Sequence, residues 1–199
     1  MTIADTVRMY LISRPHTLLA VESNIVNYSA LAREICSALN INNYAAVKAC
    51  IYRYAVKTRR INENTERRSL DLFSGNRLTL LDGIAVIISR EELNVKHNAE
   101  VRLGSYYAYF AESGTARKMT KTDKSKIIKI RDSCSALVLY SGPQLENAIG
   151  ALSFLTSLLA GQNINIIETI SCYTETIFVV DRKDAFRSYE LLSALTRMH

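Results

Sequence analysis

The sequence is poor in proline, glycine and histidine, and it has no tryptophan. Its 199 residues include 2 Pro, 7 Gly and 3 His. Such a composition does not suit long flexible linkers, and an apolar content of 48% is enough to build a substantial core. No run approaches the roughly 18 apolar residues of a membrane span, and the first residues lack the features of a signal peptide. We therefore expect an ordered cytoplasmic protein.

Residue groups that commonly bind metals or carry out catalysis are also missing. The four cysteines are far apart and form no C-x-x-C pair, which argues against a zinc site. Cys36 and Cys50 fall within or beside apolar helical stripes, so we interpret them as small buried hydrophobic residues. The sequence shows no paired carboxylates, Cys/His pair or glycine-rich phosphate motif. We predict no metal, no cofactor, no catalytic residue and no enzymatic activity.

The clearest organisation lies in residues 132–199, which read as strand, helix, strand, strand and helix. The predicted elements are 135–140, 145–159, 164–170, 174–180 and a last helix capped by Asp181. Leucines and isoleucines at helical spacing give the first helix its apolar stripe, and Gly161 ends it. Two helices on one face of an antiparallel sheet predict an α+β fold of the ferredoxin-like kind.

Residues 142–180 resemble an ACT domain of the aspartokinase kind. The resemblance rests on Gly150-Ala-Leu, on the segment from Asn163 to Ser171, and on Ile177-Phe-Val-Val180. It implies a βαββαβ unit that pairs with another, with a small ligand, often an amino acid, at the interface. The ligand positions that it implies on this chain are Gly142, Gln144, Glu146, Asn147 and Gly150, with Asn163 and Asn165 opposite on the partner domain.

Two features bear on this resemblance. Only Met198 and His199 follow the last predicted helix, so a strand from 126–130 or from 77–89 must complete the sheet, or the edge stays open. Glu146 would repel an anionic ligand unless it meets the ammonium end. An alternative is that Asn163 and Asn165 are ordinary turn and edge-strand residues in a unit that serves only for dimerisation.

The front of the chain predicts a three-helix unit. Helices are expected over 2–13, 30–39 and 44–58, with a short turn at 17–21 and an Asn-rich turn at 40–43. The order helix, short turn, basic helix is typical of a helix-turn-helix. Residues 24–33 resemble the second helix of a winged helix-turn-helix domain, and Ala45-Ala-Val-Lys48 resembles the entry of its recognition helix.

The charge is unevenly distributed along the chain. Residues 1–68 carry ten Lys/Arg against five Asp/Glu, residues 69–131 eleven against seven, and residues 132–199 four against seven. The resulting charges of +5, +4 and −3 favour a polyanionic partner for the front part. If that partner is double-stranded DNA, Lys48 would read bases and the phosphates would be contacted by Arg53, Lys57, Arg59 and Arg60. The alternative is a solvated helix face.

The middle of the chain reads as β-rich. We predict strands over 77–81 and 84–89 about a turn at Asp82-Gly83, and a hairpin of 106–111 with 115–119 about Ser113-Gly114. A strand over 126–131 would follow. The block would be either a half-size second ACT-like unit or a separate sheet. Its basic residues near three tyrosines could bind single-stranded nucleic acid, but lysines that protect an edge strand are the preferred interpretation.

Together these patterns predict a helical domain over 1–66, a β-rich segment over 67–131 and an ACT-like βαββα domain over 132–199. The leading hypothesis is a DNA-binding transcriptional regulator that responds to an amino acid and dimerises through the ACT sheet. The alternative is a regulatory or scaffold subunit of an amino-acid metabolic enzyme that does not bind DNA.

Overall fold

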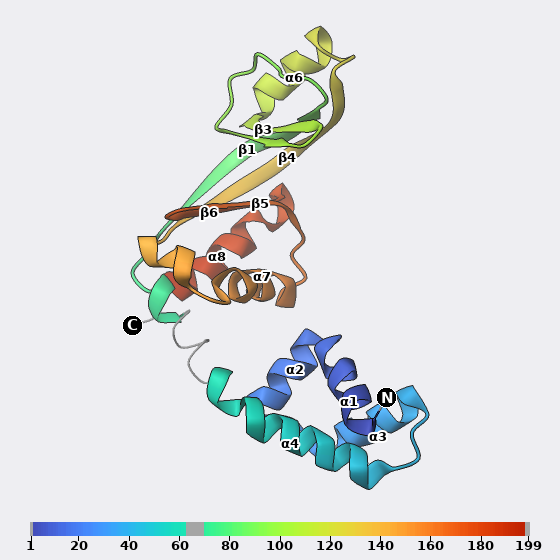
Figure 1. Cartoon of the computed structure of the whole chain (residues 1–199). Coiled ribbons are helices and arrows are strands. Elements are labelled where there is room, and N and C mark those ends of the chain that lie inside the picture. The colour runs from blue at the N-terminus through green and yellow to red at the C-terminus, as the bar shows by residue number, and fades with distance from the viewer. Residues whose placement is uncertain (1, 63–69, 198–199) are drawn as a thin grey trace. The chain divides into compact units, whose positions relative to one another are not determined.

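The computed structural model describes residues 2–62 and 70–197 of the chain, and it leaves out the side chains of residues 59–62 and 120–122. The chain forms two compact units, Met1–Arg68 and Ser69–His199, called unit 1 and unit 2 below (Figure 1). The predicted boundary at residues 66 and 67 lies outside the described residues.

Unit 1 consists of helices packed around one apolar core. The helices are α1 (Ile3–Ile12), α2 (Pro15–Glu22), α3 (Tyr28–Leu39) and α4 (Tyr44–Asn62). Fully buried residues of all four helices form the core, among them Leu11, Val21, Ile35 and Ile51. The described part of the unit has one helix more than the sequence predicted. Pro15 is the reason, because proline is well suited to the first position of a helix and here begins α2.

Asparagine and threonine side chains fix the helix ends of unit 1. Thr2 and Asp5 form a reciprocal capping box at the start of α1. The side chain of Asn27 accepts backbone N–H bonds at the start of α3, and that of Asn43 accepts the N–H of Ala46 at 3.0 Å in the first turn of α4. Between them, Asn40 takes the left-handed conformation (φ 53°) that ends α3. The predicted Asn-rich turn is therefore present.

Unit 2 is built on one antiparallel sheet of six strands in the order β2-β3-β1-β4-β6-β5. The strands are β1 (Arg77–Ser89), β2 (Ala99–Leu103), β3 (Tyr106–Glu112), β4 (Ile127–Tyr140), β5 (Ile166–Cys172) and β6 (Glu175–Asp181). Its helices are α6 (Ser113–Thr122), α7 (Ala151–Gly161) and α8 (Ala185–Thr196), with 3-10 turns η1 (Pro143–Asn147) and η2 (Arg182–Asp184). The predicted α+β fold class is confirmed.

The long strands β1 and β4 run through two successive halves of the sheet (Figure 1). The first half contains β1 residues 84–89, β2, β3, α6 and β4 residues 127–131. The second half contains β1 residues 77–82, β4 residues 135–140, α7, β5, β6 and α8. Each half has the strand order of a ferredoxin-like unit. In the second half, the start of β1 provides the strand next to β4, and it is one of the two predicted sources of that strand.

Two predicted turns of the middle segment are wrong. Asp82-Gly83 is no hairpin turn, because the residues on both sides of it pair with the same strand β4. Gly83 (φ 72°) instead marks a register shift inside β1. Ser113-Gly114 is likewise no turn, because α6 begins there. Ala116 and Met119 are three residues apart, so helical spacing places both in a core with β1 and β3.

The helices of unit 2 cover one face of the sheet. In the first half, Ala85 and Ile87 pack with α6. In the second half, Leu137 and Leu139 pack with α7 and α8, which confirms two helices on one face. The alternate residues of these strands point to the opposite face and form an apolar cluster of their own. The sheet curls, since its two edge strands β2 and β5 line one cavity together.

The two halves differ in the segment that follows their first strand. In the second half this segment contains η1 and α7, whereas the first half has only the loop 90–98. Leu93 and Val95 of this loop are buried against the sheet. The backbone N–H of Leu93 donates a buried hydrogen bond of 2.9 Å to the hydroxyl of Tyr109. The loop therefore fills the position that a helix occupies in the second half.

Candidate functional site

A cavity of about 530 Å³ lies at the N-terminal end of α7. Its walls come from the segment between β4 and α7, from the first turn of α7, and from the turn between β5 and β6. The lining residues are Leu145, Glu146, Ala148, Gly150, Ala151, Leu152, Ser153, Ser171 and Tyr173. This volume lies within the range of sites that bind small molecules, and its lining combines apolar and polar groups as such sites do.

The first turn of α7 presents backbone donors at this cavity. Gly150 precedes the helix in the left-handed conformation (φ 83°), and no side chain caps the helix. The backbone N–H of Ala151 donates to the carbonyl of Ala148, and that of Phe154 donates to the carbonyl of Gly150. Leu152 and Ser153 lie between these two residues, and within the described chain their backbone N–H groups have no acceptor. Free N–H groups and the positive end of the helix dipole favour an anionic group there.

The cavity also contains one acidic side chain and several hydroxyl groups. Glu146, on η1, is exposed and provides a negative charge next to the helix N-terminus. The hydroxyls of Ser153, Ser171 and Tyr173 can donate or accept hydrogen bonds. The site therefore offers donors to an anion and an acceptor to a cation within one cavity. It has the chemistry to bind a zwitterion.

The structure places the predicted ligand residues in three positions. Glu146 and Gly150 line the cavity, while Gly142, Gln144 and Asn147 lie on the same segment outside the lining. Asn163 and Asn165 follow the C-terminal end of α7, at the opposite end of the helix from the cavity. They were predicted to act from a partner domain, and this remains a prediction.

Sequence reasoning missed the cavity residues that come from elsewhere in the fold. Ser171 and Tyr173 lie at the β5–β6 turn, more than twenty residues after Glu146. Tyr173 adopts a positive φ of 52°, so the turn falls at this residue instead of at Ser171-Cys172 as predicted. No motif marks these residues, because they reach the cavity only through the pairing of β5 with β6.

The predicted DNA-binding residues lie on α4. Lys48, Arg53 and Lys57 are exposed, and the side chains of Arg59 and Arg60 lie outside the described part. Helices α3 and α4 with the turn between them have the order of a helix-turn-helix. The described residues of unit 1 include no strand that would form a wing. Exposed residues of α4 also include small and apolar ones, among them Ala49 and Val56, and Val56 is 59% exposed.

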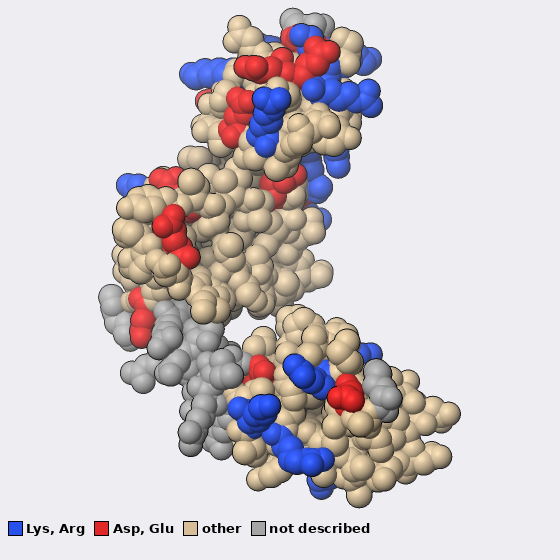
Figure 2. All heavy atoms as spheres, in the orientation of Figure 1, with Lys and Arg blue, Asp and Glu red and all other residues tan. Residues whose placement is uncertain are grey.

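The predicted basic run of the middle segment lies on and around α6. Acidic side chains lie among the basic ones at this end of unit 2 (Figure 2). Arg117 pairs with Asp132 at 3.1 Å, and Lys126 pairs with Glu91 at 3.5 Å. Tyr109 is fully buried, so it offers no ring for stacking on a base. This arrangement favours a solvated, charge-mixed surface over a nucleic-acid site.

Among the residues that the structure describes, no group of three or more His, Cys, Asp or Glu is placed to hold a metal ion. None of the described helices is long and apolar enough to cross a membrane.

Solved structures similar to this chain include regulatory parts of aspartate kinases. The ligand-free regulatory subunit of aspartate kinase from Thermus thermophilus has a TM-score of 0.51 and 8% identity, over 63% of this chain and 99% of that chain. A protein of unknown function from Vibrio cholerae, described as a possible transport protein, has a TM-score of 0.50 and 16% identity, over 65% and 96%. Unit 2 therefore has an ACT-like fold.

The likeness extends to only part of a full-length kinase. For aspartate kinase from Clostridium acetobutylicum the TM-score is 0.49 and the identity 12%, over 59% of this chain and 33% of the enzyme. No family model and no curated protein matches the sequence. At these identities the likeness establishes the fold of unit 2 alone.

Proposed function

We propose that this chain is a regulatory protein whose ACT-like unit binds a free α-amino acid in the cavity at the start of α7. The observation that carries this proposal is the pairing of free helix N–H groups with an acidic side chain around one cavity. The N–H groups of Leu152 and Ser153 would bind the ligand's carboxylate. Glu146 would bind its ammonium group. The apolar lining beside Leu145 and Ala151 would accommodate an aliphatic side chain.

The rim of this cavity favours coverage by a second copy of the chain. Leu152 and Tyr173 line the cavity and are 42% and 58% exposed, and Ile149, between the lining residues 148 and 150 in sequence, is 90% exposed. Large apolar side chains are costly to leave in water. A dimer that covers them would also enclose the ligand.

In this role the chain regulates and does not catalyse. The ACT-like fold also occurs in the regulatory subunit of an aspartate kinase. By analogy, the protein would act as a regulatory or scaffold subunit of an enzyme of amino-acid metabolism. Binding of the amino acid would shift the chain towards one of two assembly states. Both features remain part of the proposal.

A thermal-melt screen of the full chain against each of the twenty common amino acids tests the ligand. A ligand at a hundred times its dissociation constant adds about 2.7 kcal/mol to the free energy of unfolding, which corresponds to a rise in Tm of about 5–10 °C. We expect a selective rise with one amino acid or a few related ones. Glu146→Gln should reduce the rise strongly, because the ammonium group loses its counter-charge.

Glu168→Gln is the matched control. Glu168 lies on β5 outside this cavity, and its change removes the same charge from the same unit. Asn165→Ala tests the partner contribution, since loss of the rise in that variant as well as in Glu146→Gln would support a site shared between two copies. No rise with any amino acid, or a rise that Glu146→Gln leaves intact, would refute the proposal.

A second candidate function is DNA binding by unit 1. It is favoured by the order α3, Asn-rich turn and α4, and by the excess of basic residues in 1–68. Retention on a random duplex that falls steeply with salt would support it, provided that Arg53→Ala with Lys57→Ala lowers the salt slope. No retention at low salt would leave the non-DNA-binding regulator.

A further inference from the structure

A second cavity lies in unit 1, between α1 and α4. It measures about 210 Å³ and is lined by α1 residues 4, 5, 7 and 8 and by α4 residues 50, 53, 54 and 57. Its floor is apolar, since Val7 is fully buried and Cys50 and Tyr54 are half-buried in the core of the unit. Three cations, Arg8, Arg53 and Lys57, stand around this floor. We call this cavity the α1/α4 cleft.

The three cations have no ion-pair partner within the described chain. Their only recorded hydrogen bonds are two long ones from Arg53, to the Ala49 carbonyl and to the Cys50 sulfur, at 3.4 Å each. The one carboxylate in the cleft, Asp5, accepts hydrogen bonds from the backbone N–H and the hydroxyl of Thr2 at 3.0 and 2.7 Å. These bonds hold the pKa of Asp5 below its usual range, so the carboxylate is committed to the helix cap. Arg8, Arg53 and Lys57 therefore leave net positive charge on the cleft.

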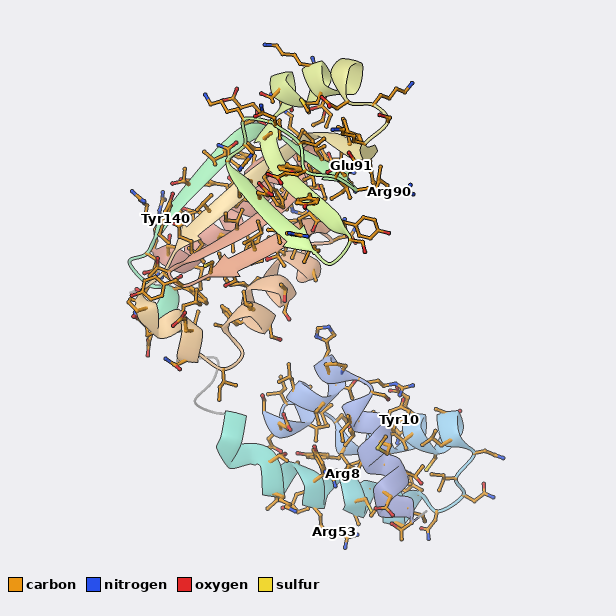
Figure 3. All side chains as sticks on the ribbon, turned by 45° about the horizontal axis from the view of Figure 1, so that its top comes forward. Arg8, Tyr10, Arg53, Arg90, Glu91 and Tyr140 are labelled. Atoms are coloured by element: carbon orange, nitrogen blue, oxygen red, sulfur yellow. The ribbon has the colours of Figure 1, made fainter. Side chains whose placement is uncertain are left out.

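Apolar side chains lie beside these cations on the same two helices. On α4, Cys50 and Tyr54 line the cleft together with Arg53 and Lys57. On α1, Ile12 lies one turn after Arg8 and is 44% exposed. In Figure 2 the basic groups of unit 1 lie among uncharged surface, with acidic groups beside some of them. Figure 3 shows Arg8 on α1 and Arg53 on α4. The surface is thus cationic and apolar at once.

We propose that the α1/α4 cleft is a docking site for an acidic, amphipathic segment of a partner protein. Carboxylates of the segment pair with Arg8, Arg53 and Lys57, and guanidinium groups suit this because they bind carboxylates in a bidentate manner. Apolar residues of the segment pack on the apolar floor of Val7 and Tyr54 and on Ile12, as in helix-in-groove recognition. Unit 1 would then attach the chain to its partner, whether or not unit 2 binds a ligand.

Charge complementarity alone would also fit the phosphates of DNA, but the apolar surface does not. A phosphate backbone gains nothing from the apolar floor of Val7 and Tyr54 or from Ile12, whereas an amphipathic peptide buries them. In addition, the exposed residues of α4 include Ala45, Ala49 and Val56, which have no side-chain group to hydrogen-bond with base edges. An acidic protein segment therefore uses more of this surface than a duplex does.

Peptide selection on the full chain tests this inference. The probe is a library of random peptides of about 16 residues displayed on phage, long enough for an amphipathic helix. We expect the selected peptides to combine Asp or Glu with large apolar residues at helical spacing. A fluorescent copy of a selected peptide should bind at least about tenfold more weakly to Arg8→Glu/Lys57→Glu, because attraction becomes repulsion at two positions. Arg8→Gln/Lys57→Gln provides a milder version in case charge reversal disturbs folding.

Lys48→Glu is the control, because it makes the same change on the same helix. Lys48 and Lys57 are nine residues apart, about two and a half turns, so they lie on opposite sides of α4. Lys48 is not part of the cleft lining. Peptide binding should therefore survive Lys48→Glu. Selected peptides without acidic residues, or binding that the cleft variants leave unchanged, would overturn the inference.

A random DNA duplex of about 20 base pairs is the competing probe. The opposing result is a duplex that binds more strongly than the peptide and loses its binding in both Lys48→Glu and Arg8→Glu/Lys57→Glu. That result would assign this surface to nucleic acid and would also overturn the inference. The amino-acid screen does not bear on this result, since its cavity lies in unit 2.

Discussion

Replacement of Tyr109 by phenylalanine isolates one buried hydrogen bond in the first half of unit 2. The ring of Tyr109 is fully buried, and its hydroxyl accepts the N–H of Leu93 at 2.9 Å. This bond attaches the loop 90–98 to the sheet where the second half has a helix. Phenylalanine keeps the ring and its packing but leaves the N–H of Leu93 without an acceptor.

An unpaired buried N–H group costs about 1–3 kcal/mol. For a chain of this length the loss lowers Tm by about 2–4 °C per kcal/mol. Tyr107→Phe is the matched control. Tyr107 lies two residues earlier on β3, and its ring stacks on that of Tyr109 at 6.2 Å between centroids. It is half-buried, and no hydrogen bond is recorded for its hydroxyl, so the control should change stability by about 0.5 kcal/mol or less.

Hydrogen exchange followed by mass spectrometry measures where the stability is lost. In Tyr109→Phe, peptides that cover residues 90–98 should exchange faster than in the parent, while peptides from α7 and α8 change little. Urea unfolding followed by far-UV circular dichroism gives the free energy. Equal destabilisation by Tyr109→Phe and Tyr107→Phe, or unchanged exchange in the loop, would refute the view that this bond anchors the loop.

Three further predictions concern other parts of the chain. Asn27→Ala removes the acceptor at the start of α3 and should cost about 1 kcal/mol, seen as a lower melting point of unit 1 with unit 2 unaffected. Leu137→Ala leaves a cavity in the core of unit 2 and should cost about 2–5 kcal/mol in urea unfolding, whereas Leu152→Ala at the surface should cost far less. Burial raises the pKa of Tyr109 and of Tyr10, so the neutral phenols stabilise the fold below pH 10 and this stability is lost as the pH rises above it. The free energy of unfolding should thus decrease above pH 10, less steeply in Tyr10→Phe.

Much of the second half of unit 2 was predictable, because residues close together in the sequence indicate its helices and strands. The run 135–140 and the run 174–180 are rich in strand formers, and both form strands, β4 and β6. The apolar stripe after Gly142 predicted a helix, which the structure divides into η1 and α7. Gly150 is the point of division, since its left-handed backbone breaks the helical pattern. The cap of α3 in unit 1 was predictable for the same reason, since Asn27 directly precedes the helix that it caps.

Prediction from the sequence failed where the same short residue pattern is compatible with two different structures. Asp82-Gly83 matches a hairpin turn, but Gly83 is instead the extra residue at a register shift within the long strand β1. Nothing in the neighbouring residues distinguishes these cases, because the choice depends on which distant strand pairs with each side. Residues 115–119 contain strand-compatible and helix-compatible residues alike. Their helix is fixed by contacts of Ala116 and Met119 with β1 and β3.

The sequence by itself determined helices α1, α3 and α4, the second part of β4, strand β6, the uneven charge and the position of Glu146 in the segment that follows β4. These features follow from residues close together in the chain, through propensity, capping and hydrophobic spacing. Only the tertiary structure decided that β1 completes the sheet of the second half, that Ser171 and Tyr173 join Glu146 around one cavity, and that Arg8 meets Arg53 and Lys57. Such contacts join residues tens of positions apart, and their formation depends on the packing of whole elements, which no local pattern encodes.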